Sequence, residues 1–221
     1  MSDLLAALAA IVGPAHVLTG AETAPWDSDW TGHYRGRPLA VVRPADRDEV
    51  AAVLRLACAQ GVAVVPVSGN TGLNGGALGA GAIALSLGRL NRVREIRAGA
   101  RVAVVEAGVV VDALNAAAAE QGLMFPLSFG ASGSAMIGGV LSTNAGGANV
   151  LRYGNTRDLC LGVEVVLADG RVMDLMTALH KNNAGFDLRD LVIGAEGQLA
   201  ITPAAVLSLL PLPPTGSPAR G

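Results

Sequence analysis

The sequence predicts a mixed α+β fold built from two lobes, and three observations support this prediction. Short apolar runs alternate with helical patterns along most of the chain. Each half of the chain carries one long, glycine-rich and almost uncharged segment. The length of 221 residues is sufficient to bury a core in one domain or in two small lobes.

The first element is expected to be an amphipathic surface helix over residues 4–12. Leu4, Leu8 and Ile11 recur at helical spacing. A secretory signal peptide would begin with basic residues, whereas this segment follows Asp3. No apolar run reaches the length that a membrane-spanning helix needs, so the sequence favours a cytoplasmic location.

A strand and a capped helix are predicted next. Residues 40–44 form a short apolar strand that ends at a proline. Asp46 and Glu49 have the spacing of a capping box, which predicts a helix through Gln60. Gly61 follows as the expected C-terminal stop, because glycine adopts the left-handed conformation that ends helices.

Further strands are predicted at residues 62–67, 83–87 and 101–106, and a helix at 111–121. The glycine-rich loop at residues 68–76 follows directly after the first of these strands. A hairpin is expected from strands 163–167 and 171–174, joined by a two-residue Asp169-Gly170 turn. Residues 193–201 are expected to hold a last turn and strand.

These elements divide the chain into an N-terminal helical segment, 1–37, and a larger domain, 38–210, with subdomains at about 38–98 and 99–210. Residues 211–221 are rich in Pro, Gly and Ser and are typical of a linker. A ligand that lies between the subdomains would contact both glycine segments.

Composition excludes several classes of function. The net charge of −2 and a pI near 5.9 argue against a nucleic-acid surface, which would show a basic excess. Only 3% of the residues are aromatic, so base-stacking platforms are not expected. Cys58 and Cys160 match no metal-ligand spacing and suggest a reducing compartment. The three histidines are scattered, and no metal site is predicted.

The two glycine segments, 68–76 and 127–162, carry most of the functional information. Glycine lacks a Cβ, which lets the main chain approach a ligand closely. Successive N–H groups in such turns form anion-binding nests without a lysine. One such segment alone is equally typical of a surface turn, but ordering two of them is costly without a ligand. Together they predict a site for a diphosphate.

The usual nucleotide motifs do not account for these segments. A dinucleotide-binding Rossmann turn needs G-x-G-x-x-G at the start of a helix, and the glycines from Gly69 to Gly76 have a different spacing. A P-loop needs Gly-Lys-Ser/Thr, but Gly138 is followed by Gly139 and Val140.

Several ordered motifs resemble the flavin domain of FAD-linked 2-hydroxy-acid dehydrogenases. That family includes D-lactate dehydrogenase, the flavin subunit of glycolate oxidase, and D-2-hydroxyglutarate dehydrogenase. The resemblance covers about residues 4–210. It rests on PVSGNTGL (66–73), FPL (125–127), IGG (137–139), TNAGG (143–147), LRYG (151–154), KNNAGFDL (181–188) and GAEG (194–197), and on the early DW (29–30) and YRGR (34–37).

The resemblance implies the FAD-binding fold of the vanillyl-alcohol-oxidase type, with FAD extended between two α+β subdomains. It implies non-covalent FAD, because no histidine stands in the first loop, where covalent members of the wider superfamily attach the flavin. The residues expected to bind FAD are Pro66, Ser68, Gly69, Asn70, Thr71, Gly72, Leu73, Pro126, Gly130, Ala131, Ser134, Gly138, Gly139, Asn144, Ala145, Gly147, Glu196, Gly197 and Ile201.

Members of this family oxidise a 2-hydroxy acid by hydride transfer to flavin N5. Much of the substrate site in the family comes from a domain that follows the flavin domain, and this chain is expected to lack it. His33, His180 and Arg152 are the local candidates, and each has a structural explanation, so no catalytic residue is assigned. A separate substrate-domain chain or an electron acceptor is an expected partner, and an apolar patch is expected where that domain packs.

Three interpretations remain open at this point. The chain is the FAD module of a dehydrogenase that needs a substrate domain, a flavin-binding fragment without turnover, or a reductase of the cell-wall precursor type that shares the fold. Five residues depart from the family pattern: Ser68, Ala184, Phe186, Gln198 and Ala200. Ala200 in place of glycine would cost about 1 kcal/mol if it were held at positive φ.

Overall fold

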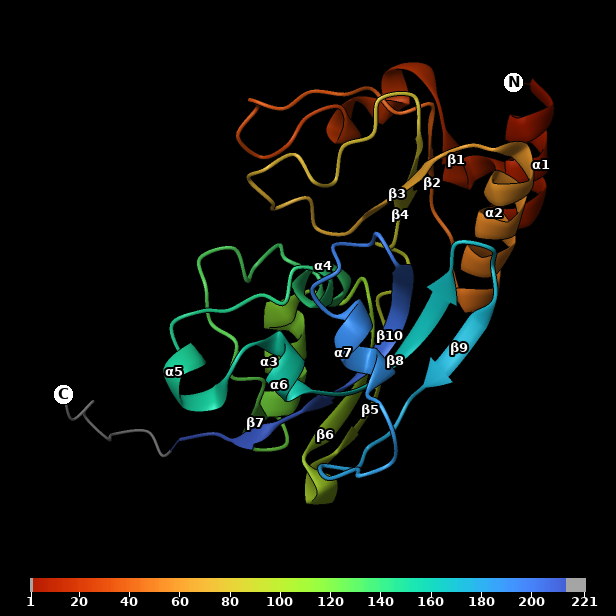
Figure 1. Cartoon of the computed structure of the whole chain (residues 1–221). Helices are drawn as coiled ribbons and strands as arrows, with labels where there is room; N and C mark the ends of the chain where they lie inside the picture. The colour runs from red at the N-terminus through yellow and green to blue at the C-terminus, as the bar shows by residue number, and fades with distance from the viewer. Residues whose placement is uncertain (1, 214–221) are drawn as a thin grey trace.

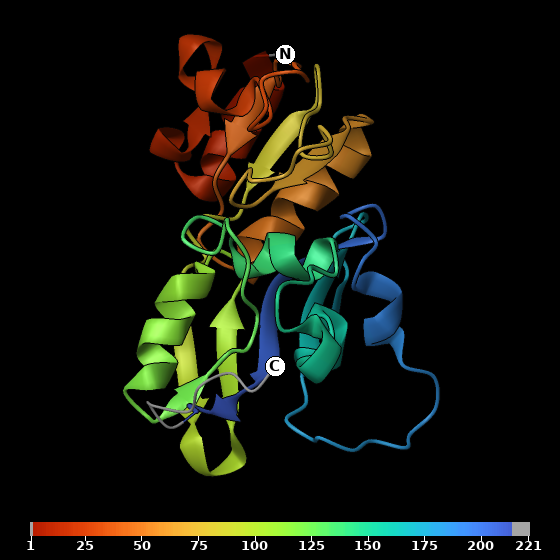
Figure 2. The same ribbon diagram turned by 90° about the vertical axis from the view of Figure 1, so that its left-hand side faces the viewer.

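A computed structural model describes residues 2–213 and has the two-lobed α+β architecture that the sequence predicts (Figure 1). The first lobe contains a four-stranded sheet and the second a five-stranded sheet, with one further two-stranded ribbon. The two lobes are stacked one above the other in Figure 2. Of the predicted tail, residues 214–221 lie outside the described residues.

The first lobe comprises two α-helices, two 3-10 helices and four strands. In chain order they are α1 (Ser2–Val12), η1 (Pro14–His16), β1 (Val17–Leu18), η2 (Gly20–Trp26), β2 (Ala40–Val42), α2 (Arg47–Gln60), β3 (Val64–Val67) and β4 (Ile83–Ser86). The strand order is β1-β2-β4-β3, with β1 antiparallel to β2 and the other neighbours parallel. The N-terminal segment therefore adds a strand to the first sheet.

The predicted signals at both ends of α2 are confirmed. The Asp46 carboxylate accepts a hydrogen bond of 2.9 Å from the Glu49 amide, as expected for an N-cap. The Glu49 carboxylate reaches back one residue further than a standard capping box and accepts from the Ala45 amide at 2.6 Å. Gly61 ends the helix with φ of 63°.

The second lobe surrounds an antiparallel sheet with the strand order β5-β6-β10-β8-β9, and β11 pairs with β7 beside it. Its elements are β5 (Val93–Arg97), η3 (Ala98–Ala100), β6 (Val102–Glu106), α3 (Val111–Ala119), β7 (Leu123–Met124), α4 (Ile137–Ser142), α5 (Val150–Tyr153), α6 (Thr156–Leu159), β8 (Cys160–Leu167), β9 (Val172–Leu175), α7 (Leu188–Val192), β10 (Ala200–Ser208) and β11 (Leu210–Pro211).

The central strand β10 extends well beyond the segment that the sequence predicted. Pro203 lies inside it, and a proline normally argues against a central strand because it cannot donate a ladder hydrogen bond. The structure accommodates it at an irregularity between Ile201 and Ala204 in the pairing with β8. The Pro203 carbonyl accepts a hydrogen bond of 2.8 Å from the Ala107 amide, so this side of the strand stays paired.

The predicted two-residue turn between β8 and β9 is wrong. The Leu167 amide donates to the Arg171 carbonyl at 2.9 Å, which leaves three residues, 168–170, in the loop. Gly170 has φ of 80°, as in a type I turn that is closed by a left-handed glycine. The Asp-Gly pair thus occupies the second and third positions of a longer turn.

Strand β5 and helices α4 to α7 were not predicted. β5 carries Arg94, Glu95 and Arg97 at the edge of its sheet, where charges discourage pairing with another chain. The four helices have four to six residues each, and three of them lie within the second glycine segment. Helices this short depend on tertiary contacts rather than on their own sequence.

The two lobes share part of one hydrophobic core. The core beneath α1 and α2 includes Ala107, Val166 and Ile201 from the second lobe. The β8–β9 hairpin packs on α2, where the Gly170 carbonyl accepts a hydrogen bond of 3.5 Å from Arg55. Burial of apolar surface across this boundary fixes the orientation of one lobe relative to the other.

Two buried glutamates reinforce the boundary. Glu106 and Glu164 flank Ala204 across the second sheet. Glu106 is 1% exposed and accepts hydrogen bonds from Arg92 and Arg94 at 2.8–3.1 Å. Glu164 pairs with Arg47 of α2 at 3.2 Å. Buried carboxylates require such partners, because an unpaired buried charge is strongly unfavourable.

Stability is expected to fall at acidic pH because of Glu106. Burial acts to raise the pKa of this carboxyl, but the hydrogen bonds from Arg92 and Arg94 outweigh it and hold the pKa below its ordinary value of 4.5. A lowered folded-state pKa gives stability that is complete above the unfolded-state pKa and is lost as the pH falls through the folded-state pKa.

Urea unfolding over a pH series checks this prediction. Glu106→Gln should lose about 3 kcal/mol at pH 7 and should show a smaller decline below pH 4.5 than the wild type. The exposed Glu120→Gln variant should keep the wild-type profile. If the free energy of unfolding fell equally with decreasing pH in the wild type and in Glu106→Gln, the loss of stability could not be assigned to Glu106.

Gly170→Ala is expected to destabilise the protein by about 2 kcal/mol, for two reasons. Alanine is strained in the left-handed conformation of this residue, and its Cβ would overlap the Ala51 carbonyl oxygen, 2.6 Å away. Gly122→Ala is the matched control. Gly122 is also left-handed, with φ of 68°, but has open space around the Cβ position, so the cost should be about 1 kcal/mol. If urea unfolding showed the same loss of stability for both variants, the β8–β9 hairpin would not be in close contact with α2.

Candidate functional site

The structure brings the two predicted glycine segments into direct contact at the boundary between the lobes. The first follows β3, and the second leads into α4, which lies at this boundary in both ribbon views (Figures 1 and 2). A Cβ on Gly69 would overlap the Ser134 carbonyl, and one on Gly139 would lie 3.2 Å from the Cβ of Ser68. Glycine is therefore required for this approach.

A cavity of about 300 Å³ lies between these segments. Both lobes contribute main chain and small side chains to its wall. The first lobe supplies Pro66, Val67, Ser68, Gly69, Asn70, Thr71, Gly72, Asn74, Gly76, Ala77 and Leu87. The second lobe supplies Phe129, Ala131, Ala135, Met136, Gly138, Gly139, Val140, Ser142, Thr143, Ala145, Glu196, Ala200, Ile201 and Thr202.

Most of the residues expected to bind FAD line this cavity. They come from four separate segments of the chain that the fold gathers at one place. They are Pro66, Ser68, Gly69, Asn70, Thr71, Gly72, Ala131, Gly138, Gly139, Ala145, Glu196 and Ile201. Their role as ligands remains a prediction, and what the structure adds is their common location.

The other expected residues lie beside the cavity rather than on it. Leu73 projects into solvent, and the Ser134 carbonyl faces Gly69. The Asn144 side chain accepts a hydrogen bond of 2.9 Å from the Arg157 amide. The remaining members of this set are Pro126, Gly130, Gly147 and Gly197.

Sequence reasoning missed several residues of the wall. Asn74, Gly76, Ser142 and Thr143 belong to the glycine segments, so the composition of those segments was an available signal. Leu87 and Thr202 reach the cavity only through tertiary packing. No local pattern in the sequence distinguishes them from ordinary core residues.

The wall is almost free of charge. Glu196 is the only ionisable side chain among the described residues that line it. The Ser68 hydroxyl oxygen is buried without a hydrogen-bond partner among the described residues. A buried polar atom without a partner is unfavourable, and a bound polar ligand would relieve it. The Ser68 hydroxyl is thus available to a polar ligand, and the glycine segments predict that this ligand is a diphosphate.

Three residues of the expected FAD site have left-handed backbones without being glycine. Asn70, Asn144 and Glu196 have φ of 48°, 47° and 52°. The Asn70 side chain donates to the Ser28 carbonyl at 3.1 Å, which ties the first loop to the N-terminal segment. Such backbones cluster at ligand sites. Ala200 lies in β10 and is not among the residues with positive φ, so the strain expected there is absent.

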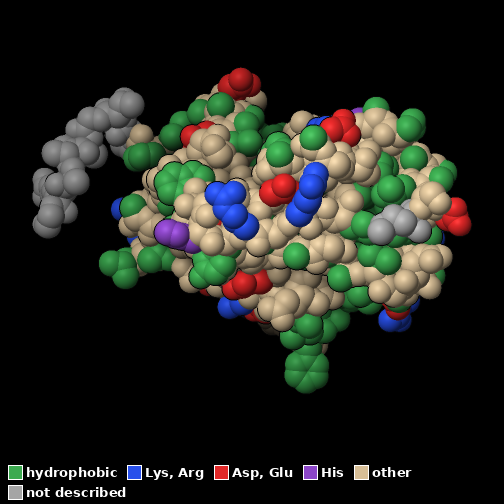
Figure 3. Space-filling model, turned by 90° about the horizontal axis from the view of Figure 1, so that it is seen from above, with side chains coloured by type: hydrophobic (Ala, Val, Ile, Leu, Met, Phe, Trp, Pro, Cys, Tyr) green, Lys and Arg blue, Asp and Glu red, His purple; other side chains and the backbone are tan. Residues whose placement is uncertain are grey.

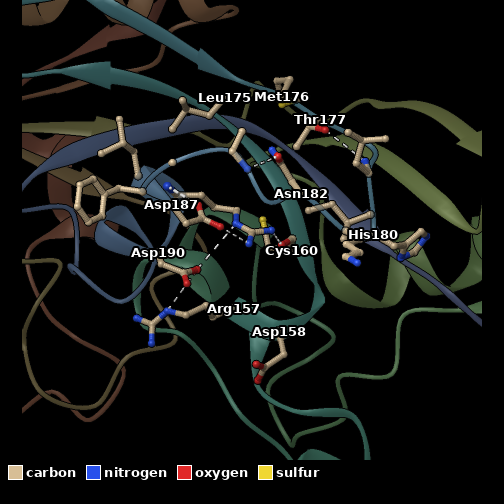
Figure 4. A pocket seen from close by; sticks show the side chains of 18 of the residues that line it. Arg157, Asp158, Cys160, Leu175, Met176, Thr177, His180, Asn182, Asp187 and Asp190 are labelled. Carbon is tan, nitrogen blue, oxygen red and sulfur yellow. Dashed lines mark hydrogen bonds and ion pairs between the residues drawn. The ribbon is translucent and has the colours of Figure 1, made fainter.

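A larger hollow of about 730 Å³ lies elsewhere, beside α6, α7 and the loop after β9 (Figure 4). Both arginines that line it are paired: Arg189 pairs with Asp187 at 2.5 Å, and Arg157 lies 4.0 Å from Asp190. Burial raises the pKa of the Cys160 thiol to about 12, so this thiol is not a nucleophile at neutral pH. We therefore favour the smaller cavity as the functional site.

The three candidate catalytic residues are dispersed. The His180 ring lies 3.1 Å from the Ala100 carbonyl, and Arg152 stacks over the Tyr153 ring at 5.2 Å. His33 lies in an exposed turn that links Ser28 to Arg35. None of the three lines the cavity between the glycine segments.

Surface charge is also dispersed. On the face seen in Figure 3, Lys and Arg side chains stand apart from one another and alternate with acidic groups. Within the described residues, no three His, Cys, Asp or Glu side chains are arranged to hold a metal ion. The described helices include none that is long and apolar enough to cross a membrane.

The chain is similar in sequence to known proteins. Residues 38–176 match the family model described as FAD binding domain. The chain belongs to this family. It is 47% identical over 195 residues to the D-2-hydroxyglutarate dehydrogenase of Xanthomonas citri pv. viticola, covering 88% of this chain and 41% of the relative. It is 43% identical to the mitochondrial D-2-hydroxyglutarate dehydrogenase of Bos taurus, covering 96% of this chain and 39% of the relative.

Solved structures agree on the fold. An alkyldihydroxyacetonephosphate synthase superposes with a TM-score of 0.86 at 19% identity, covering 97% of this chain and 41% of the other. The 6-hydroxy-D-nicotine oxidase of Arthrobacter nicotinovorans gives a TM-score of 0.78 at 25% identity, covering 89% and 42%. The predicted α+β fold of the vanillyl-alcohol-oxidase type is confirmed.

FAD is the cofactor of this domain, and the wall of the cavity fits it. A Cβ placed on Gly72 would meet only the Asn74 side chain, at 3.8 Å, so space remains there for a ligand. The uncharged main chain around it suits a diphosphate. The chain spans about two-fifths of the length of the curated relatives that it matches.

Gly72→Val is expected to separate binding from folding. The new side chain has room in the protein, so the free energy of unfolding should change by less than about 0.5 kcal/mol. The same side chain would occupy the cavity, so FAD affinity should fall at least about tenfold. Calorimetric titration and urea unfolding measure the two quantities.

Gly69→Val is the contrasting variant. Its Cβ would overlap the Ser134 carbonyl, so both stability and FAD affinity should fall. Unchanged FAD affinity in Gly72→Val would show that the ligand lies outside this cavity.

Proposed function

We propose that this chain is the FAD-binding module of a flavin-dependent oxidoreductase that oxidises a D-2-hydroxy acid of the 2-hydroxyglutarate, lactate or glycolate type. The observation that carries the proposal is the contact between two glycine segments around an uncharged cavity. Relatives at 40–47% identity are named D-2-hydroxyglutarate dehydrogenases, which supports the first of these substrates.

In this proposal the chain binds and orients the cofactor. The segment after β3 donates main-chain N–H groups to the diphosphate, and the first turn of α4 faces it from the opposite lobe. FAD supplies the hydride-accepting N5 atom of its flavin ring. The first loop contains no histidine, so we propose that FAD is held without a covalent bond. The predicted division at about residues 38–98 and 99–210 differs from the two lobes at β5, which pairs with β6 in the second sheet.

The substrate is expected to be bound mainly by another part of the enzyme. Oxidation of a 2-hydroxy acid needs a cation for the carboxylate and a base for the hydroxyl. The described wall of the cavity contains neither Lys, Arg nor His. We therefore propose that a substrate domain, on the same or a separate chain, supplies these groups and that an electron acceptor reoxidises the flavin.

An exposed apolar patch supports such a partner domain. Leu179, Phe186, Leu188 and Leu191 project from the loop after β9 and from α7, and Phe186 is 98% exposed. Large apolar side chains that gather on one surface mark interaction sites. Phe186 is also one of the positions at which this sequence departs from the family pattern, and it does not line the cavity.

The alternative is a flavin-binding protein without turnover of its own. The absence of a cation on the described cavity wall favours it for this chain alone. The two functions differ in one observable, which is the reduction of bound flavin by substrate. A cytoplasmic location remains a prediction, and the Bos taurus relative is named as mitochondrial.

The purified protein is expected to be yellow and to release free FAD when precipitated with acid. Adding FAD to the cofactor-free protein should raise its unfolding temperature, because a ligand that binds only the native state stabilises it. At a hundredfold excess over Kd the gain is about 2.7 kcal/mol. Visible absorption and thermal unfolding measure these outcomes, and a colourless protein that FAD does not stabilise would contradict the proposal.

Substrate tests separate the two functions. With D-2-hydroxyglutarate or D-lactate alone, the flavin absorbance is expected to persist. Adding the remaining portion of a D-2-hydroxyglutarate dehydrogenase relative as a separate polypeptide should bleach it. Bleaching by this chain alone would show that the described residues suffice for catalysis.

A further inference from the structure

We propose that the Trp30 loop (residues 27–36), together with Leu73, is the docking surface for an electron-carrier protein that presents an acidic face. The inference rests on the proposed function, because oxidation of a 2-hydroxy acid leaves two electrons on the flavin, and a further reaction must remove them. It assigns a surface and a charge to the electron acceptor, which the cavity itself does not identify.

The Trp30 loop is held by hydrogen bonds around the buried Asp29. The Asp29 amide donates to the Tyr34 carbonyl at 3.2 Å, and its carboxylate accepts from the Thr31 hydroxyl at 2.8–2.9 Å and from the Tyr34 amide at 3.3 Å. The Gly36 amide donates to the Asp27 carbonyl at 2.8 Å. Because these bonds order the backbone before a partner arrives, little conformational entropy is lost when the loop is bound.

The Trp30 loop packs on the first glycine segment, which lines the FAD cavity. The two loops are neighbours at the upper left of Figure 1. Asn74 and Gly76 line the cavity, whereas Gly75 between them faces Tyr34, and a Cβ there would lie 2.7 Å from the Tyr34 ring. A protein that binds the Trp30 loop would therefore lie close to the cofactor.

Large apolar side chains project from this surface. Trp30 is 74% exposed, Leu73 60% and Tyr34 51%. Exposed apolar side chains that gather on one surface mark sites where proteins bind one another. Tryptophan, tyrosine and arginine are also the residue types that contribute most to binding at protein interfaces. The surface therefore has the composition of a protein-binding site.

Arg35 and Arg37 make this surface positive. Neither forms an ion pair within the described part of the chain, whereas most of the other described arginines do. The two carboxylates of the loop, Asp27 and Asp29, already accept hydrogen bonds from Thr23 and from the loop itself. The chain as a whole has a net charge of −2, so this positive charge is local. A complementary partner presents carboxylates.

This surface differs in kind from the apolar patch on the second lobe. That patch, at Leu179, Phe186, Leu188 and Leu191, has the character of a permanent domain interface. The Trp30 loop combines a few aromatic side chains with unpaired cations, which suits a transient encounter that is steered by charge. An electron carrier must bind and leave in every turnover. A membrane surface is less suitable, because binding to anionic lipid takes clusters of about four or more Lys and Arg.

Two forms of one redox protein test the assignment on this chain alone. Cytochrome c is basic, and succinylation converts its lysine amines to carboxylates, so the two forms differ in the sign of their surface charge. In titration calorimetry the FAD-loaded chain should bind the succinylated form saturably. The affinity should fall at least about tenfold from about 20 to about 200 mM salt, since salt screens the attraction. The native form should not bind.

Rapid mixing measures the electron transfer itself. The bound flavin is first reduced by light with EDTA as the electron donor and is then mixed anaerobically with either form. Each reduced flavin gives one electron to each of two haem irons, and its protons pass to the solvent. At low salt the succinylated form should be reduced at least about tenfold faster than the native form. A neutral quinone should oxidise the flavin of the wild type and of every variant at the same rate.

Arg35→Glu and Trp30→Ser should each weaken the binding of succinylated cytochrome c about tenfold and slow its reduction. Both side chains are exposed, so FAD affinity and the unfolding temperature should not change. Lys181→Glu and Leu151→Ser are the matched controls, because they alter exposed side chains of the second lobe. Each control should change the affinity less than about twofold.

Three results would overturn the assignment. The first is that the FAD-loaded wild type does not bind succinylated cytochrome c. The second is that Lys181→Glu weakens binding as much as Arg35→Glu, which would indicate attraction by the overall charge. The third is binding to phosphatidylserine vesicles that Trp30→Ser abolishes, without binding of succinylated cytochrome c, which would make the surface a membrane contact. A chain that binds no FAD would instead contradict the proposed function.

Discussion

The contact between the two glycine segments is the constraint on which the rest of this structure depends. Gly69 faces the Ser134 carbonyl and Gly139 faces Ser68, so the two loops meet without intervening side chains. The cavity between them is lined by main chain and uncharged side chains, apart from Glu196. Such a wall can neutralise a diphosphate only with oriented amides, which are rigid and already in place before binding.

The relative position of these two loops is fixed by contacts between the lobes around α2. The core under α2 includes residues of both sheets, and Glu164 of the second sheet pairs with Arg47 of α2. Pro203 of the central strand β10 lies at an irregularity in the pairing of β10 with β8. Because packed cores deform little, the spacing of the glycine loops is set by contacts on the opposite side of the interface.

Local signals allowed much of this structure to be predicted. The caps of α2 and the apolar strands beside it were read from a few residues each, and ordered glycine motifs located four segments that meet at one cavity. The turn at Gly170, the length of β10 and the helices within the glycine segment depend on tertiary contacts that no local pattern contains. Leu87 and Thr202 line the cavity for the same reason, whereas Glu196 was expected among the residues that bind FAD.

The most direct test of the central claim is the response of individual backbone amides to the cofactor. Amide chemical shifts in a nitrogen-15 spectrum should move for residues of both loops, 69–72 and 138–139, when FAD is added, and ADP should move the same set. Hydrogen bonds to phosphate shift the bonded amide protons to lower field. Shifts confined to one loop, or centred on the hollow around Arg157 and Arg189, would contradict the account.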